Sequence, residues 1–171
     1  MNTVAEAQHA ENNAITFVKI ENKTGATITY FTSHDFSGRL APHSRYPPNL
    51  ENGRDHLFEH MGTPGDNAGS SAAVVYSVTN NDGTVSYWML SWSNPIVGNY
   101  KVLTKIGGQA YPKSSPNDPI WHKLDEELSN SGTTNTSEWK GCVSYMTSIR
   151  SNNVPNRVDV DATVARATAR A

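Results

Sequence analysis

The segment His56–His60 has the sequence His-Leu-Phe-Glu-His, the spacing of the inverted zinc-protease motif. In that motif two histidines four residues apart bind one metal ion from a helix, and the glutamate acts as a base. Glycine and proline residues on both sides of this segment favour a short β-strand instead. On a strand the two histidines lie about 13 Å apart, at about 3.3 Å per residue, which is too far to share a metal ion. We therefore predict a strand over about 55–61, no metal site and no cofactor.

Other residue types that catalyse reactions occur without the partners that such chemistry needs. Ser70, Ser71, Ser91 and Ser93 are candidate nucleophiles, but none lies in a Gly-x-Ser-x-Gly elbow. The six histidines show no spacing that supplies a base to any of them. The acidic run 125–127 is typical of the solvated face of a helix. The sequence therefore favours a protein that is not an enzyme.

Aromatic and amide side chains surround the short loop 93–99 and favour ligand recognition. Trp92 and Tyr100 flank the loop, and Asn94, Pro95 and Asn99 lie within it. An aromatic ring beside polar groups can hold a sugar or a lipid headgroup, because the ring supplies apolar or cation–π contact and the amides supply hydrogen bonds. These five residues are the candidate ligand-binding set. The alternative is that the aromatic side chains of this region belong mainly to the core.

Strands must position this loop. Residues 70–106 contain three β-rich runs, and the turn 81–83 between the first two contains Asp-Gly, a strong hairpin signal. The middle run is apolar on both faces, as expected for a strand that is covered on both sides. Its two sets of side chains are Trp88, Leu90 and Trp92 against Tyr87 and Met89.

Further strands are predicted at about 14–21, 26–34, 55–61, 141–150 and 157–165, around a structured loop at 37–54. In the strand 141–150, Val143, Tyr145 and Ile149 mark the apolar side. In the last strand the inward residues are Val158, Val160, Ala162 and Val164. One helix is predicted at about 119–130, with Asp118 as its N-cap and Pro119 at its first position. Its apolar face is formed by Ile120, Trp121, Leu124 and Leu128.

About eight or more strands and one helix predict a mainly β protein, a single β-sandwich at 14–165 with the helix packed against it. Residues 1–13 are expected to be loose and residues 166–171 to form a frayed tail. The net charge of −2 over 171 residues gives no electrostatic footprint for nucleic acid. The single cysteine, Cys142, and the absence of a secretory pattern in residues 1–13 favour a cytoplasmic location. No apolar run predicts a transmembrane segment.

Several strings of the sequence resemble the plant 23 kDa jasmonate-induced proteins. They are Tyr46–Pro48, Gly69–Tyr76 and Trp88–Pro95, continued by Trp121–Leu128 and Trp139–Cys142. The resemblance covers roughly residues 14–150. It implies a stress- and hormone-induced plant protein of a family whose biochemical activity is poorly defined.

A fainter similarity runs to the β-sandwiches of the actinoporins and aegerolysins. Residues Val18–Gly25 resemble their first strand and turn, and the strand that reaches Pro95 resembles the phosphocholine-site strand of the actinoporins. The loop after this proline is shortened to 96–99, and residues 1–13 are too short and polar to form the actinoporin pore helix. The resemblance therefore implies the fold and not pore formation.

The combined interpretation is a non-enzymatic stress or defence protein that recognises a glycan, as a lectin does, a lipid headgroup or a protein partner. Nucleic acid is not an expected partner, and self-association into a homo-oligomer stays open. The alternative is a membrane-acting, cytolysin-like protein, and a hydrolase is the least favoured class.

Overall fold

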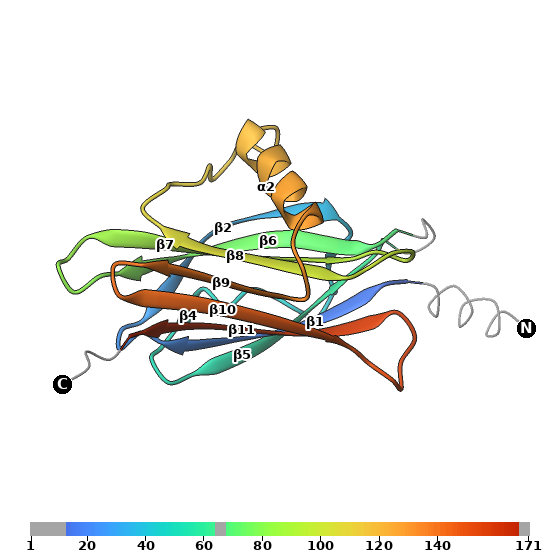
Figure 1. Cartoon of the computed structure of the whole chain (residues 1–171), viewed down its shortest axis with the longest axis horizontal. Helices are drawn as coiled ribbons and strands as arrows, with labels where there is room; N and C mark the ends of the chain where they lie inside the picture. Colours follow the sequence, from blue (N-terminus) through green and yellow to red (C-terminus); the bar gives the residue numbers. More distant parts are fainter. Residues whose placement is uncertain (1–12, 64–67, 168–171) are drawn as a thin grey trace, which may run out of the picture.

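A computed structural model describes residues 13–63 and 68–167, so residues 1–12 of the predicted N-terminal segment and 168–171 of the predicted tail lie outside the described residues. Within these residues two β-sheets pack face to face, and one helix covers the outer face of one sheet (Figure 1). The six-stranded sheet has the order β3 (Arg39–Leu40), β5 (Asp55–Met61), β1 (Ile15–Lys23), β11 (Arg157–Arg166), β10 (Cys142–Arg150) and β9 (Thr134–Trp139). The five-stranded sheet has the order β4 (Asn49–Leu50), β2 (Ile28–Ser37), β6 (Ser70–Thr79), β7 (Val85–Asn94) and β8 (Lys101–Gly107). The predicted sandwich is confirmed.

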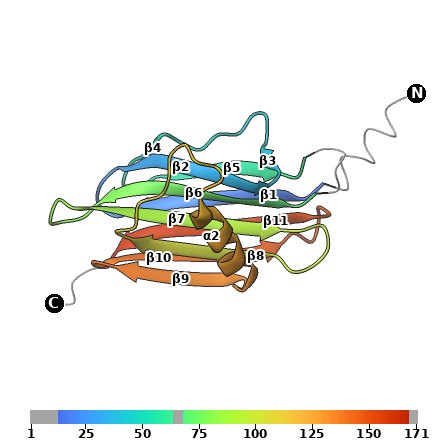
Figure 2. The same ribbon diagram turned by 90° about the horizontal axis from the view of Figure 1, so that it is seen from above.

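The two ends of the domain meet in the middle of the six-stranded sheet. The first strand, β1, pairs in parallel with the last, β11, and antiparallel with β5. Figure 2, which views the sandwich from above, shows the helix lying across the five-stranded sheet. The segment 55–61 is a strand, as predicted from its flanking glycines, and Phe58 points inward while Leu57 is exposed.

The central strand β7 is buried on both faces. Trp88, Leu90 and Trp92 lie in the main core between the sheets, whereas Met89 lies in a second cluster beneath the helix α2 (Pro119–Ser129). The other members of this second cluster include Ala73, Val75, Leu103, Trp121, Leu124 and Leu128. This arrangement confirms the prediction of a strand that is covered on both sides.

The helix begins as the sequence predicts. The Asp118 side chain accepts a hydrogen bond from the backbone N–H of Ile120 at 3.0 Å, and Pro119 occupies the first helical position. This satisfies a backbone donor that a helix start otherwise leaves without a partner. The helix ends at Ser129, with Asn130 as its C-cap.

Strand β9 is one element that the sequence did not predict, because Thr134–Trp139 lacks apolar alternation. It pairs with β10 along its length, and its side chains accept hydrogen bonds from backbone N–H groups at the edge of β8. Asn135 Oδ1 accepts a hydrogen bond from the backbone N–H of Thr104 at 2.9 Å, and Ser137 Oγ accepts one from Ile106 at 3.1 Å. An open sheet edge is a template for unwanted pairing, so β9 closes the sandwich on this side. The short strands β3 and β4 lie inside the predicted loop 37–54.

Strand β10 reverses the expectation from its sequence, because its more apolar side faces solvent. Tyr145 is 47% exposed and Ile149 is 67% exposed. The buried side is formed by Cys142, Ser144 and Met146. Burial of Ser144 is tolerated because its Oγ lies 3.0 Å from Thr104 Oγ1, so the hydroxyl keeps a hydrogen-bond partner. In β11, by contrast, the predicted inward residues are all buried.

Candidate functional site

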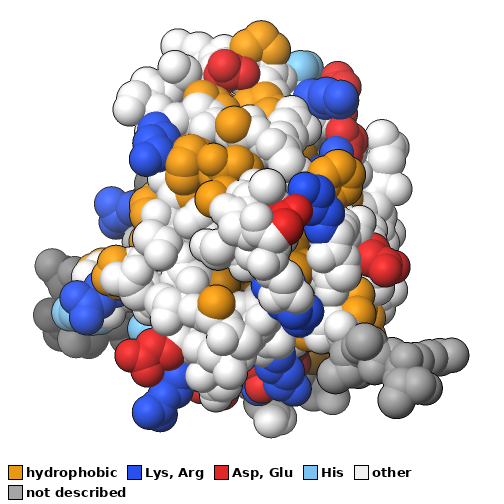
Figure 3. All heavy atoms as spheres, turned by 90° about the vertical axis from the view of Figure 1, so that its left-hand side faces the viewer, with side chains coloured by type: hydrophobic (Ala, Val, Ile, Leu, Met, Phe, Trp, Pro, Cys, Tyr) orange, Lys and Arg blue, Asp and Glu red, His pale blue; other side chains and the backbone are white. Residues whose placement is uncertain are grey.

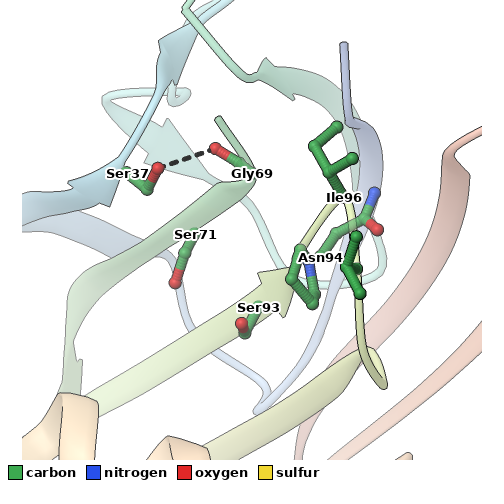
Figure 4. Close-up of a pocket in the computed structure, with 8 residues that line it drawn as sticks. Ser37, Gly69, Ser71, Ser93, Asn94 and Ile96 are labelled. Carbon is green, nitrogen blue, oxygen red and sulfur yellow. Dashed lines mark hydrogen bonds between the residues drawn. The ribbon is translucent and has the colours of Figure 1, made fainter. Parts of the chain in front are cut away.

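A pocket of about 490 Å³ lies where β7 ends beside the start of β6 and the end of β2 (Figure 4). Its polar side is formed by Ser37, Ser71 and Ser93, and its apolar side by Pro95, Ile96 and Val97; Gly69 and Asn94 complete the lining. Ser71 and Ser93 are direct neighbours in the pairing of β6 with β7. Both therefore point to the outer face of the five-stranded sheet, because side chains paired across two strands share a face.

A glycine allows the wall of the pocket to form. A Cβ atom at Gly69 would lie 2.9 Å from the backbone oxygen of Asn94 and 2.9 Å from the Cα of Pro95. Only a residue without a side chain lets the chain at 94–95 come this close to β6. Ser37 fixes the other side, since its Oγ donates a hydrogen bond to the carbonyl of Gly69 at 2.9 Å.

The pocket is uncharged, and two of its hydroxyls are available. No lining residue is acidic or basic. The hydroxyls of Ser71 and Ser93 have no hydrogen-bond partner among residues 13–63 and 68–167. Hydroxyls can donate to phosphate or carbonyl oxygens and accept from hydroxyls or amides. The site can therefore bind a polar group through two hydroxyls while the wall at 95–97 contacts an apolar part.

The five residues predicted from the sequence are not gathered in this pocket. Asn94 and Pro95 line it. Asn99 is exposed but does not line the pocket. Tyr100 packs against the main core, and Trp92 lies within that core with 1% of its surface exposed. Trp92 supports the end of β7 from the inside and has no surface to offer a ligand.

Asn94 holds the loop that forms the pocket wall. Its Nδ2 donates hydrogen bonds to the backbone carbonyls of Ile15 and Asn156, each at 3.0 Å. The side chain is 1% exposed, and its Oδ1 has no partner in the described part of the chain. Sequence reasoning considered Ser71 and Ser93 only as nucleophiles and missed their role as pocket hydroxyls. Ser71 and Ser93 are equally far in sequence from the centre of the 81–83 hairpin turn. Their pairing across the two strands could therefore have been predicted from the sequence.

A relay with the order of a hydrolase triad runs from the half-exposed Asp35 into the space between the sheets. Asp35 Oδ1 is 2.9 Å from His60 Nε2, and His60 Nδ1 is 2.8 Å from Ser70 Oγ. Thr16 Oγ1 donates to Ser70 Oγ at 2.8 Å. Ser70 and His60 have no exposed surface, so no substrate reaches the hydroxyl. The relay joins β1 and β5 of one sheet to β2 and β6 of the other, and we interpret it as a clamp.

A second, more polar pocket of about 230 Å³ lies beside the start of α2. His34 stacks on Trp121 there, with ring centroids 5.0 Å apart. Burial lowers the pKa of His34, although the nearby negative charges of Asp35 and Asp125 act to raise it. Asp118 and His122 also line this pocket. Stacking already occupies one face of the Trp121 ring, and nothing else in the cavity indicates a ligand.

In the described residues, no group of three histidine, cysteine, aspartate or glutamate side chains is placed to hold a metal ion. The two histidines of the 56–60 motif lie on β5, where His60 binds Ser70 and Asp35 instead. No helix in the described ranges is long and apolar enough to cross a membrane.

Comparison with known proteins gives consistent matches. The family model described as Nakanori-like protein matches residues 2–160. The 23 kDa jasmonate-induced protein of Hordeum vulgare is 33% identical over 125 residues, which cover 72% of this chain and 58% of that protein. The jasmonate-induced protein homolog of Atriplex canescens is 33% identical over 120 residues, 68% of this chain and 62% of that protein. The chain thus spans less than two thirds of each relative, and the predicted resemblance to jasmonate-induced proteins is confirmed.

Two solved structures share the fold. The lipid-binding protein Nakanori matches with a TM-score of 0.75 and 22% identity, over 96% of this chain and 80% of that chain. The RahU protein, crystallised with a Tris molecule, matches with a TM-score of 0.50 and 11% identity, over 92% of this chain and 98% of that chain. At these identities the likeness concerns the architecture alone.

Proposed function

The chain belongs to the Nakanori-like protein family, and we propose that it is a lipid-headgroup-binding protein whose ligand site is the pocket at the end of β6 and β7. One observation carries the proposal. The pocket places two available hydroxyls, Ser71 and Ser93, opposite an aliphatic wall at 95–97. The fold it shares with Nakanori, which is described as a lipid-binding protein, supports the same class of ligand.

The chemistry of the pocket suits the boundary between a headgroup and the apolar part of a lipid. Its volume of about 490 Å³ falls within the range of about 300–1,000 Å³ that small-molecule sites occupy. The hydroxyls bind headgroup oxygens, and the side chains of Ile96 and Val97 contact the less polar glycerol or acyl region. An uncharged lining favours a headgroup without a net charge, because no buried ion has to be paired.

The five residues predicted from the sequence have different parts in this proposal. Asn94 and Pro95 shape the wall of the pocket. Trp92 supports that wall from the core, while Asn99 and Tyr100 lie on the following turn of the loop. We further propose a non-enzymatic role in plant stress, in line with the jasmonate-induced relatives and with the inaccessible Ser70. A cytoplasmic location is part of the same proposal, supported by the buried, unpaired Cys142.

Vesicle co-sedimentation tests the function. The wild type and a Ser71→Val, Ser93→Val double variant are mixed with vesicles of phosphatidylcholine, and the bound fraction is measured. We expect the wild type to bind and the double variant to lose about tenfold in affinity, the loss of roughly one good hydrogen bond. The control is Ser114→Val, an exposed serine of another loop.

Two outcomes would contradict the proposal. If the wild type does not bind vesicles of any headgroup, the protein has a different class of ligand. If the double variant binds as well as the wild type, the site lies elsewhere. Release of trapped calcein from the same vesicles would favour the alternative, a cytolysin-like activity.

A further inference from the structure

The end of the sandwich that carries the pocket combines exposed aliphatic side chains with basic residues. We propose that this end docks on a phospholipid bilayer, with Val97 and Val154 entering the membrane interface and Arg150 binding lipid phosphates. The inference rests on the proposed function and extends it from one pocket to a surface. We call this surface the docking end and define it as the loops 94–100 and 149–157.

The two loops are held together as one rigid surface. Asn94 Nδ2 donates to the carbonyl of Asn156 at 3.0 Å, so the first loop is fixed to the second. The backbone N–H of Ile15 donates to the same carbonyl at 3.0 Å, and this connects both loops to the start of β1. Both views of the ribbon place the two loops at the same end of the sandwich (Figures 1 and 2). Neither loop therefore has to move for both to contact one flat partner.

Aliphatic side chains project from the docking end. Val97 is 89% exposed at the tip of the first loop. In the second, Ile149 is 67% and Val154 is 37% exposed. Large aliphatic side chains that gather at one end of a protein mark an interaction surface. Val97 also lines the pocket, so the exposed residues continue the apolar wall of the proposed headgroup site.

The charge of the docking end favours a surface of phosphates. Its two loops contain two arginines and no acidic residue. Arg157 is already paired, because its Nε lies 2.9 Å from Asp159 Oδ1 and its guanidinium lies 4.1 Å from the Phe17 ring centroid. Arg150 forms no ion pair with any residue that the structure describes. Its guanidinium lies 5.3 Å from the Tyr100 ring centroid.

A lipid surface fits these features better than a protein partner does. Val97 and Val154 stand on separate loops, and Ile149 lies at the end of β10 beside the second loop. Separate projecting side chains suit shallow entry into a soft interface. Arginine next to such tips can keep its charge at the phosphate level while its stem lies against apolar groups. The opposite end of the sandwich differs in its charge: Lys140 and Asp82 form an ion pair at 3.4 Å, and Figure 3 shows basic, acidic and hydrophobic side chains mixed over that end. Val85 and Trp139 are exposed there, but they lie beside this ion pair and not beside Arg150.

A fluorescent probe at each end tests the docking orientation. The chain has one native cysteine, Cys142, which is buried, so an introduced surface cysteine can be labelled selectively. Val154→Cys, which lies outside the pocket lining, and the control Val85→Cys, 47% exposed beside the 81–83 turn, each receive an environment-sensitive NBD label. With vesicles of phosphatidylcholine and phosphatidylserine, we expect a blue shift and quenching by lipid-borne quenchers at position 154 and neither at 85.

The outcomes separate this inference from the proposed function. If both labelled proteins co-sediment with vesicles but position 154 shows no blue shift, the docking end is wrong, whereas the headgroup site, which does not include Val154, is untouched. If neither protein nor the unlabelled wild type binds vesicles, the proposed function fails and the docking end fails with it. As a second measurement, Val154→Asp and Arg150→Gln, both outside the pocket lining, should each weaken vesicle binding about tenfold. Unchanged binding of both variants would also overturn the docking end.

Discussion

His60 Nδ1 lies 2.8 Å from Ser70 Oγ, and neither side chain has any exposed surface. With Asp35 on the other ring nitrogen, the three side chains have the order of a hydrolase triad. They connect the two sheets at a point that no substrate reaches. The ring nitrogens have exchanged the partners that they have in a catalytic triad, and the Ser70 hydroxyl donates to the backbone carbonyl of His60 at 3.2 Å. The relay therefore serves to hold two layers in register, because buried polar groups must be paired.

The clamp predicts a loss of stability when Ser70 is replaced. Ser70→Ala leaves the His60 ring and the Thr16 hydroxyl without their buried partner. We expect the free energy of unfolding to fall by about 1–3 kcal/mol, measured by urea denaturation. Ser114→Ala, in an exposed loop, is the control and should be neutral. An esterase activity that disappears in Ser70→Ala would show that the relay is catalytic after all.

Gly69 predicts a local change in the pocket. In Gly69→Ala the new methyl group would lie 2.9 Å from backbone atoms of residues 94 and 95, so the loop has to shift. We expect weaker vesicle binding with little change in the far-ultraviolet circular dichroism spectrum. Gly107→Ala is the matched control, because its added Cβ meets nothing within 4 Å. If both variants bind equally well, the position of the 94–97 loop does not matter for the ligand.

The helix predicts two effects of different size. Asp118→Ala removes the N-cap hydrogen bond to Ile120 and should cost about 1 kcal/mol of stability. Leu124→Ala opens a cavity in the second core cluster and should cost about 2–5 kcal/mol. Denaturation midpoints measure both. Equal effects would mean that the helix does not depend on its packing against β7 and β8.

Buried tyrosines predict unfolding at alkaline pH. Burial raises the pKa of Tyr111 to about 12 and also raises the pKa values of Tyr46 and Tyr76 well above their usual range. The unfolded chain loses these protons near pH 10. The contribution of each tyrosine to stability is therefore complete below about pH 10 and is lost as the pH rises toward its folded pKa. In an absorbance titration these three phenols should ionise only together with loss of the near-ultraviolet dichroism. Ionisation of all seven tyrosines near pH 10 in a folded protein would contradict this.

The sequence by itself determined those elements whose defining residues lie close together in the chain. The Asp-Gly turn at 81–83, the cap at Asp118 and the two-sided apolar strand β7 are fixed by residues close in the chain, and the structure confirms them. Flanking glycines were enough to identify 55–61 as a strand despite its metal-like spacing. The resemblance to jasmonate-induced proteins was also present in the sequence.

Only the tertiary structure decided the features that depend on distant partners. Strand β9 exists because β10 pairs with it and β8 needs its side chains, which no alternation in 134–139 reveals. The buried side of β10 was decided by the hydroxyl of Thr104, which satisfies Ser144 from the other sheet. The pocket and the relay join residues up to 60 positions apart, such as Ser37 with Val97. Hydrogen bonding and packing between the two sheets leave no local pattern in the sequence. The sequence therefore indicated the loop 93–99, whereas only the tertiary structure determined which residues line the pocket.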